Sequence, residues 1–246
     1  MPHIKGLLFD YGNTLLLDPF EEVLKRIERR LKAILSGAGV NDVEGFLSSW
    51  REANSEVHDK FFSHFYQEPE IVERALSKHV PDVSGELVSK ILKLYRLGFK
   101  EVVSSNVHVK RVRELLLKLK GFGLKLGVVS DERSTYLREG LKVMKVANLF
   151  DVIVASEDVK REKPDPALFL HALALLRCRP NEVIYVGDDP LKDIRPAKEL
   201  GMITVLYRPS VPYRVNTRWR SYRSDVAADF VITELQDLVS LSLIHI

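Results

Sequence analysis

The sequence contains one cysteine, Cys178, so no disulfide can form within the chain and no cysteine pair is available for a metal site. No apolar run approaches the ~20 residues that a membrane-spanning helix needs. Residues 1–6 also lack the layout of a signal peptide. The charge is nearly balanced, because 37 basic and 34 acidic side chains give a formal net charge of +3, which does not favour a nucleic-acid or membrane-surface partner. We therefore expect a cytoplasmic protein without a membrane partner.

Helical and strand patterns alternate over most of the chain. Its 246 residues, 46% of them apolar, are enough for one sizeable core and a small second domain. The short apolar runs that predict strands are residues 4–9, 124–129, 152–155, 183–186, 203–206 and 230–232. Strands that alternate with helices indicate βαβ units and a parallel sheet. We predict an α/β fold with a Rossmann-like parallel sheet.

One long stretch near the start shows helical periodicity and no convincing strand. Apolar side chains recur there at steps of three and four residues, as at Val23, Ile27 and Leu31. Further helices are expected over residues 43–65, 71–79 and 87–97. We predict an all-helical insert over residues 19–100, and a sheet domain formed by residues 1–18 and 101–246.

Asp10 directly follows the first predicted strand, at the strand end where open α/β sheets build their sites. A lone aspartate at such a position is most often a turn residue. The residues after it favour a site instead. Tyr11 and Gly12 follow, and a loop that turns at glycine can aim backbone N–H groups inward to bind an anion. Thr14 could then hold the loop through its hydroxyl group.

Three more aspartates, Asp188, Asp189 and Asp193, follow the strand predicted over residues 183–186. Bringing them close to Asp10 would be unfavourable through like-charge repulsion unless a cation lay among them. Carboxylates and a backbone carbonyl suit Mg²⁺, which completes its coordination with water and substrate phosphate. Alternatively, Asp189 begins a turn and Asp193 caps a helix.

The position of Pro196 predicts where that helix begins. Proline cannot lie deep inside a helix, so we expect the helix to start near Asp193 and not at Pro190. Asp193 is then a candidate N-cap as well as a partner of the metal ligands. Gly201 is placed to end the same helix.

Lys163 and Ser130 are candidate partners for a phosphate group. Lys163 lies in a charged run, which is usually solvated, and precedes Asp165 and Pro166, which can cap and begin a helix. Beside carboxylates and a phosphate, its ammonium group would neutralise charge on the nucleophile and on the transferring group. Ser130 follows a predicted strand and could donate its hydroxyl to a phosphate oxygen, although an ordinary turn serine fits the same place.

These segments together resemble the four motifs of the haloacid dehalogenase superfamily, in the group with a helical cap between the first two motifs. The motifs are Phe9-Asp10-Tyr11-Gly12-Asn13-Thr14, Val129-Ser130-Asp131, Lys163-Pro164-Asp165-Pro166 and Gly187-Asp188 followed by Asp193. The resemblance covers about residues 1–18 and 105–240. It implies that Asp10 is the nucleophile of a Mg²⁺-dependent phosphatase and forms a phosphoaspartyl intermediate, with Lys163 as its catalytic partner.

The resemblance also implies roles for the remaining residues. Those expected to hold Mg²⁺ are Asp10, the carbonyl of Gly12, and Asp188. Those expected to support these ligands are Thr14, Asp189 and Asp193. Those expected to contact a small phosphorylated substrate are Tyr11, Gly12, Ser130, Asp131 and Lys163.

One position departs from the pattern. Most phosphatases of this superfamily have a second aspartate two residues after the nucleophile, which protonates the leaving group, whereas this chain has Gly12 there. Loss of such a general acid can be worth ~10² to 10⁴ in rate. A phosphatase is the leading prediction, and a catalytically weak or inactive binding or regulatory protein is the main alternative. A phosphonate hydrolase would need a lysine from the cap, and the metal motif disfavours a 2-haloacid dehalogenase.

Two segments bear on the choice of substrate. The first is rich in aromatic and histidine residues, which we expect chiefly to pack the helices of the insert together. Its members are Trp50, His58, Phe61, Phe62, His64, Phe65 and Tyr66. The second, residues 207–223, interleaves arginines with aromatic residues, a pattern that can bind nucleic acid but more often forms a solvated loop. We expect a small phosphorylated metabolite as the substrate and no nucleic-acid partner.

Overall fold

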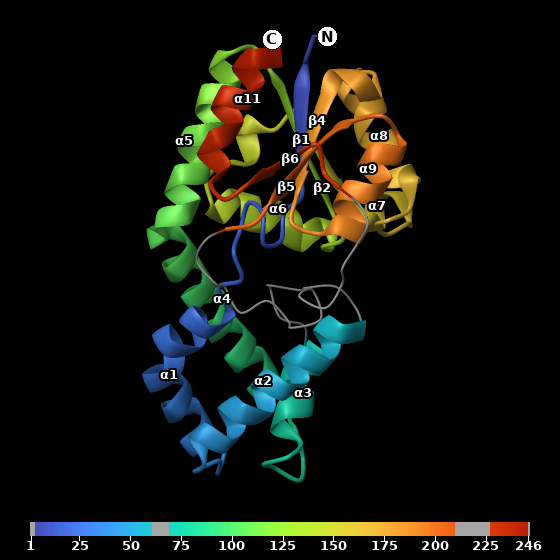
Figure 1. The fold of residues 1–246 in the computed structure, drawn as a ribbon. Coiled ribbons are helices and arrows are strands. Elements are labelled where there is room, and N and C mark those ends of the chain that lie inside the picture. Colours follow the sequence, from blue (N-terminus) through green and yellow to red (C-terminus); the bar gives the residue numbers. More distant parts are fainter. Residues whose placement is uncertain (1–2, 61–68, 210–226, 246) are drawn as a thin grey trace. The chain divides into compact units, whose positions relative to one another are not determined.

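The computed structural model describes residues 3–60, 69–209 and 227–245 of the chain (Figure 1). Its contacts divide the chain into two compact units. The core unit comprises Met1–Asp18 and Asn106–Ile246, and the helical unit comprises Pro19–Ser105. The boundary between Ser105 and Asn106 lies five residues beyond the boundary that the sequence predicts between residues 100 and 101, because helix α4 continues to Ser105.

The core unit is built on a six-stranded sheet in which every pairing is parallel, with the order β3-β2-β1-β4-β5-β6. The strands are β1 (Gly6–Phe9), β2 (Lys125–Ser130), β3 (Val152–Ala155), β4 (Val183–Gly187), β5 (Ile203–Tyr207) and β6 (Phe230–Ile232). All six lie where apolar runs predict them. The predicted α/β class and parallel sheet are therefore confirmed.

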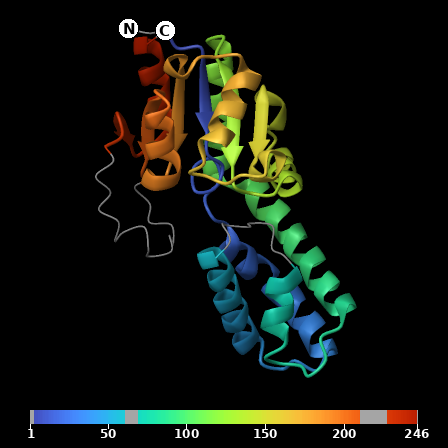
Figure 2. The ribbon, with the colours of Figure 1, turned by 90° about the vertical axis from the view of Figure 1, so that its right-hand side faces the viewer.

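The helices of the core unit cover both faces of this sheet. They are α5 (Val107–Gly121), α6 (Ser134–Val143), α7 (Ser156–Val159), α8 (Pro166–Leu176), α9 (Arg195–Glu199) and α11 (Leu238–His245). Helices α5 and α11 lie on one side of the sheet and α8 and α9 on the other (Figures 1 and 2). Between these layers, all four residues of β1 are buried, as expected for a central parallel strand.

The helical unit contains α1 (Phe20–Gly37), α2 (Val43–Lys60), α3 (Pro69–Leu76) and α4 (Gly85–Ser105) among its described residues. Its core is aromatic, since Trp50 contacts the rings of Phe20, Phe46 and Tyr95 with centroids 5.6–6.1 Å apart. Trp50 thus packs helices together as predicted. The other members of that aromatic and histidine-rich segment lie outside the described side chains, as does most of residues 207–223.

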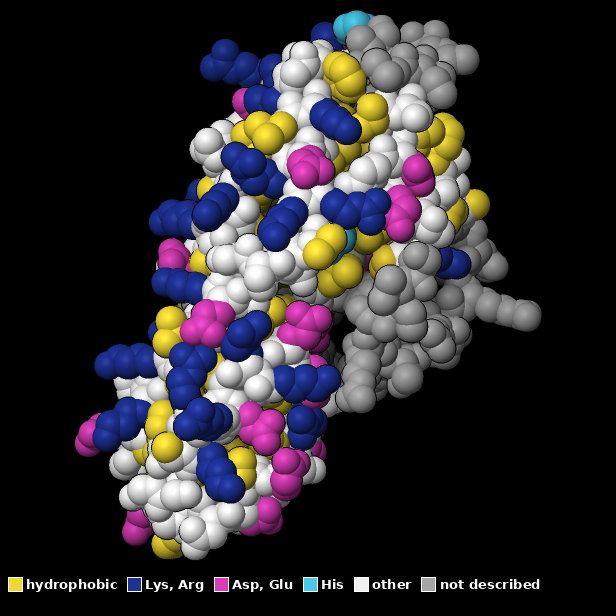
Figure 3. Space-filling view, turned by 90° about the vertical axis from the view of Figure 1, so that its left-hand side faces the viewer, with side chains coloured by type: hydrophobic (Ala, Val, Ile, Leu, Met, Phe, Trp, Pro, Cys, Tyr) yellow, Lys and Arg dark blue, Asp and Glu magenta, His cyan; other side chains and the backbone are white. Residues whose placement is uncertain are grey.

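No helix in the described parts of the chain combines the length and the apolar character needed to cross a bilayer. On the face formed by α5, Lys and Arg side chains are scattered among single apolar ones (Figure 3). The exposed apolar side chains of this helix include Val107 and Leu117. Isolated apolar side chains of this kind are ordinary on a protein surface.

One helix start differs from the sequence expectation. The cap after β4 is Asp189, whose Oδ1 accepts hydrogen bonds from the N–H groups of Leu191 and Lys192, and not Asp193. A π-helical turn, Pro190–Ile194, follows and leads into α9. The α-helix itself begins at Arg195, with Pro196 in its first turn, where a proline needs no N–H partner. Helical backbone therefore starts at Pro190, earlier than expected, whereas the α-helix starts close to Asp193. The expected end at Gly201 is confirmed, with a left-handed φ of 86°.

Candidate active site

The carboxyl ends of three neighbouring strands bring the candidate residues together. In the register of the sheet, Phe9 of β1 lies beside Val128 of β2 and Val186 of β4. Asp10, Ser130 and Asp188 follow these positions by one or two residues, so they reach the same edge. Lys163 comes from the loop between α7 and α8, where Asp165 caps α8 and Pro166 begins it, as the sequence predicts.

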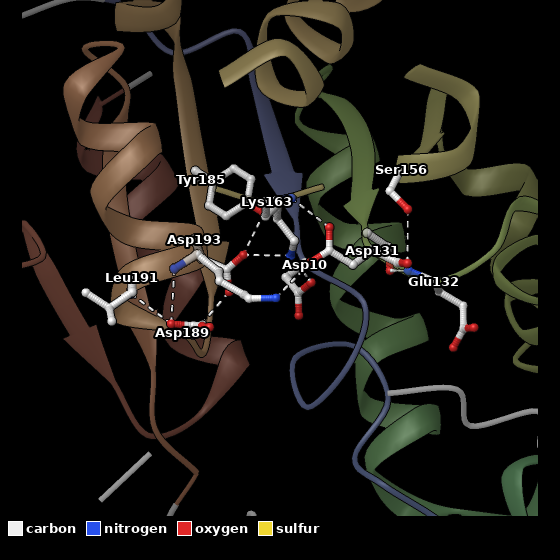
Figure 4. Close-up of polar contacts among 11 residues, drawn as sticks. Asp10, Asp131, Glu132, Ser156, Lys163, Tyr185, Asp189, Leu191 and Asp193 are labelled. Atoms are coloured by element: carbon white, nitrogen blue, oxygen red, sulfur yellow. Dashed lines mark hydrogen bonds and ion pairs between the residues drawn. The ribbon is translucent and has the colours of Figure 1, made fainter. Parts of the chain in front are cut away.

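Lys163 is the centre of the polar network at this edge (Figure 4). Its Nζ lies 2.5 Å from Oδ1 of Asp10 and 2.8 Å from Oδ1 of Asp193. The Lys163 side chain is only 5% exposed. Burial lowers the pKa of Lys163, but the carboxylates of Asp10 and Asp193 outweigh it and raise that pKa well above its ordinary value. Lys163 is therefore a fixed positive charge against the candidate nucleophile.

Asp193 is held from several directions. The hydroxyl of Tyr185 donates to its Oδ1 at 3.0 Å, and the N–H of Asp189 donates to its Oδ2 at 3.1 Å. A Cβ atom at Gly187 would lie 2.5 Å from Cγ of Asp193, so glycine is needed there to make room for the carboxylate. The oxygens of Asp193 are thus engaged by the protein, which fits the expected supporting role.

The acidic residues form a cluster suited to a hard divalent cation. One carboxylate oxygen from each of Asp10, Asp188 and Asp193 lies within 4.8 Å of the others. Burial and the charge of Asp193 raise the pKa of Asp10 to about 7, against the opposing effect of Lys163. Burial, Asp10 and Asp193 likewise raise the pKa of Asp188 well above its ordinary range. Such crowding of carboxylates is what a bound divalent cation relieves.

Asp189 lies at the margin of this cluster. Its Oδ2 is buried and has no hydrogen-bond partner among the described residues, while its Oδ1 caps the π-helical turn. Burial and the charge of Asp193 raise the pKa of Asp189 to about 6. An oxygen donor set with an unsatisfied buried carboxylate oxygen fits a cation such as Mg²⁺.

The loop after Asp10 differs from its predicted shape in two ways. Asn13, and not Gly12, takes the left-handed conformation, with φ 57°. Asparagine tolerates this region unusually well among non-glycine residues, so the turn moves by one position. The hydroxyl of Thr14 has no partner among the described residues, so it does not hold the loop. Backbone bonds do so instead, from the N–H groups of Leu15 and Leu16 to the carbonyl of Tyr11.

The side chain of Tyr11 is part of the core and is 2% exposed. Its hydroxyl lies against Gly140 of α6, where an added Cβ would come within 2.0 Å of it. The ring therefore anchors the loop to α6. Only the backbone of Tyr11 is left for the substrate contact that the sequence predicts.

Ser130 and Asp131 are also engaged by the protein. Ser130 accepts a hydrogen bond from the N–H of Glu132 at 3.1 Å, which leaves its hydroxyl proton able to bond elsewhere. Asp131 accepts from the N–H of Lys163 at 2.8 Å and pairs with Nζ of Lys192 at 3.2 Å. Its carboxylate thus contacts two parts of the chain rather than standing open for a ligand.

Two residues near the site were not predicted from the sequence. One is Lys192, which resembles a solvated lysine in a polar turn. The other is His108, whose Nε2 lies 3.2 Å from the carbonyl oxygen of Thr14 and whose ring stacks on Tyr207. Burial lowers the pKa of His108, which favours the neutral ring as the hydrogen-bond donor to the loop. No pattern in the sequence links either residue to Asp10.

Comparison with known proteins identifies the family. The family profile described as haloacid dehalogenase-like hydrolase matches residues 52–207, more than half of the chain. The chain is 30% identical over 246 residues to a glyceraldehyde 3-phosphate phosphatase of Methanocaldococcus jannaschii, and the aligned region covers 97% of this chain and 96% of the relative. The chain belongs to the haloacid dehalogenase-like hydrolase family. The predicted resemblance is thereby confirmed.

Other relatives of this family carry different names. The chain is 26% identical over 211 residues to the pyrophosphatase PpaX of Bacillus mycoides, and the aligned region covers 84% of this chain and 93% of the relative. Among solved structures, it matches a HAD phosphatase from Thermococcus onnurineus with a TM-score of 0.58, 23% identity and 97% of both chains covered.

It also matches a 2-haloacid dehalogenase from Pseudomonas syringae pv. Tomato with a TM-score of 0.64, 22% identity and 98% of both chains covered. At such identities the structural likeness establishes the fold and not the reaction. The choice between reactions therefore depends on the residues of this site.

Proposed function

We propose that the protein is a Mg²⁺-dependent phosphatase that acts on a small phosphorylated metabolite. The observation that carries this proposal is the contact of a buried lysine, Lys163, with a candidate nucleophile, Asp10, beside the carboxylate of Asp188. A dehalogenase needs no metal, so a second acidic group at the nucleophile favours phosphate chemistry. The similarity to relatives named as phosphatases and pyrophosphatases supports the same reaction class.

In the proposed reaction, Asp10 attacks the phosphorus atom and displaces the alcohol or acid oxygen of the substrate. A bond forms between the Asp10 carboxylate and phosphorus, and the bond from phosphorus to the leaving oxygen breaks. Water then attacks the phosphoaspartyl group and regenerates the carboxylate with release of inorganic phosphate. Lys163 neutralises charge on Asp10 and on the phosphoryl oxygens, and the hydroxyl of Ser130 can donate to one of those oxygens.

The residues that would hold Mg²⁺ are Asp10, the carbonyl of Gly12, and Asp188. When bound, the ion would supply positive charge that polarises the phosphoryl group. Asp193 keeps Lys163 in place beside these ligands, and Asp189 adds negative charge at the margin of the cluster. These contacts support a role for the two residues in holding the site together.

Gly12 determines which substrates should react fastest. Because the chain has glycine where a general acid is usual, the leaving oxygen must depart as an anion or take its proton from water or another residue. We therefore expect aryl and acyl phosphates to react faster than alkyl phosphates. Introducing the acid by Gly12→Asp should raise alkyl phosphate turnover by at most the ~10² to 10⁴ typical of general acids. Similar kcat values for both substrate classes, with chemistry rate-limiting, would contradict this assignment.

A direct test compares wild-type protein with Asp10→Asn. Phosphate release should be measured with and without Mg²⁺ on an aryl phosphate, glyceraldehyde 3-phosphate and inorganic pyrophosphate. We expect Mg²⁺-dependent turnover by the wild-type protein, and none by the variant because an amide is a poor nucleophile. Turnover equal to that of Asp10→Asn on every substrate would overturn the proposal.

A second candidate function follows from the same glycine. A protein that binds a phosphorylated ligand without turning it over would retain Asp10 and Lys163 and could dispense with the acid. Calorimetry with inorganic phosphate and Mg²⁺ separates the two functions, because this alternative requires binding by a protein that shows no turnover.

A further inference from the structure

The ion pair between Lys192 and Asp131 spans the carboxyl end of the strand that bears the nucleophile. Asp131 follows β2, Lys192 lies in the turn after β4, and β1 runs between these two strands. Nζ of Lys192 lies 3.2 Å from Oδ2 of Asp131, and the two side chains are 17% and 7% exposed. The pair therefore links the two loops that flank Asp10.

The second oxygen of Asp131 connects this pair to the catalytic lysine. Oδ1 of Asp131 accepts a hydrogen bond of 2.8 Å from the backbone N–H of Lys163. The side chain of Lys163 extends from there to Asp10 and Asp193. Asp131 thus fixes the backbone of Lys163, and the carboxylates of Asp10 and Asp193 fix its ammonium group.

Lys192 is itself held at its backbone. Its N–H donates to Oδ1 of Asp189 at 3.1 Å, so the lysine begins from a fixed point in the turn that also contains Asp193. A mostly buried ion pair between two fixed points restrains both loops. Loss of one partner would leave the other charge buried and uncompensated.

We propose that Lys192 and Asp131 form a positioning pair that sets the place of Lys163 against Asp10. The inference rests on the proposed function, because it assigns how the catalytic pair of that reaction is held. It reassigns Asp131 from substrate contact to positioning. It also gives a role to a lysine that the expected catalytic and binding set does not include.

The chain contains a control pair of the same layout at the other end of β2, although its side chains, Lys120 and Asp151, are 35% and 40% exposed. Asp151 accepts a hydrogen bond from the backbone N–H of Leu126 in β2 at 2.8 Å and an ion pair from Lys120 at 2.9 Å. One carboxylate again joins a backbone N–H to a lysine. This pair lies at the amino end of β2, away from Asp10.

The experiment measures kcat and KM for an aryl phosphate, and the inhibition constant of inorganic phosphate, with Mg²⁺ present. Lys192→Met, Asp131→Asn and the double variant are compared with Lys120→Met and Asp151→Asn. We expect kcat of the first set to fall by about 10 to 10²-fold because Lys163 is misplaced. Because Lys163 also faces the phosphoryl oxygens, KM should rise and phosphate inhibition should weaken, but by less than the fall in kcat, and the double variant should be no worse than the poorer single variant. Lys192→Arg should recover most of kcat.

Three results would overturn the proposal. A rise in KM and weaker phosphate inhibition at unchanged kcat would make Lys192 a substrate contact. Equal losses in the control variants would indicate a general effect on the fold. Additive losses in the double variant would show that the two residues act separately.

If wild-type protein shows no turnover, the proposed function has failed, and a crystal structure of Lys192→Met still decides this inference. A displaced Lys163 that has lost its contact with Asp10 supports the positioning role. An unchanged contact overturns it.

Discussion

Replacing Gly187 by alanine should disable the site through Asp193. The new Cβ would lie 2.5 Å from both Cγ and Oδ2 of that side chain, far inside an ordinary contact. Asp193 is 1% exposed, and it accepts hydrogen bonds from Lys163, Tyr185 and the Asp189 backbone. It cannot move aside without breaking at least one of them.

Two effects of different size follow from this overlap. Overpacking of a filled interior costs ~1–3 kcal/mol of the free energy of unfolding. A shift of Asp193 would also move Lys163, and a misplacement of ~1 Å in a catalytic group can cost 10²-fold in rate. We therefore expect Gly187→Ala to remain folded but to lose about 10²-fold in kcat.

The assay combines aryl phosphate kinetics with urea unfolding, and Gly127→Ala is the control. A Cβ at Gly127 would lie 2.6 Å from Cδ2 of Leu8, an apolar side chain in the sheet. That variant should lose stability to a similar degree while its kcat stays close to that of the wild-type protein. If Gly187→Ala also keeps its kcat, or if both variants lose kcat in proportion to stability, the reasoning about Asp193 is refuted.

Three further changes test other parts of the structure. Gly98→Ala would place a Cβ 2.3 Å from Ile27 where α4 meets α1, and urea unfolding should show that the free energy of unfolding falls by ~1–3 kcal/mol. An unchanged urea midpoint would contradict this close approach. Gly140→Ala would push against the hydroxyl of Tyr11 and so displace the loop that follows Asp10, and kinetics should show a lower kcat. Full activity would show that the position of the Tyr11 ring does not affect catalysis. Hydrogen bonds, from Arg179 first, lower the pKa of Glu182 to about 2, so its stabilising effect is complete above pH 4.5 and is lost as the pH falls toward 2. Glu182→Gln should therefore unfold more easily than wild-type protein at pH 7, and a difference that persisted at pH 2 would contradict this origin.

The strands could be predicted from the sequence because each is a short apolar run that is buried in the sheet. β1 and β4 are wholly buried, so no alternation of polar residues blurs their pattern. Asp10 and Asp188 follow such runs directly. Their approach at one edge was therefore predictable from the parallel topology, although the order of the strands was not.

The local geometry of the loops could not be predicted in the same way. Gly12 and Asn13 both tolerate a left-handed backbone, and only the assembled loop places the turn at Asn13. Asp189 and Asp193 are both acceptable caps, and the π-helical turn that selects Asp189 leaves no mark in the sequence. Lys192 was missed for a related reason, because its role depends on β1 lying between β2 and β4.

The charges at this edge of the sheet control the ionisation of Asp10. Burial raises the pKa of Asp10 above its ordinary range, so the fold alone disfavours the ionised form of the proposed nucleophile. A carboxylate attacks phosphorus only when it is ionised, and a cation among the aspartates would lower that pKa. Lys163 supplies part of the required positive charge, but Asp193 offsets some of it. The arrangement therefore favours an ionised Asp10 most strongly when a divalent ion is bound, which would link activation of the nucleophile to occupation of the metal site.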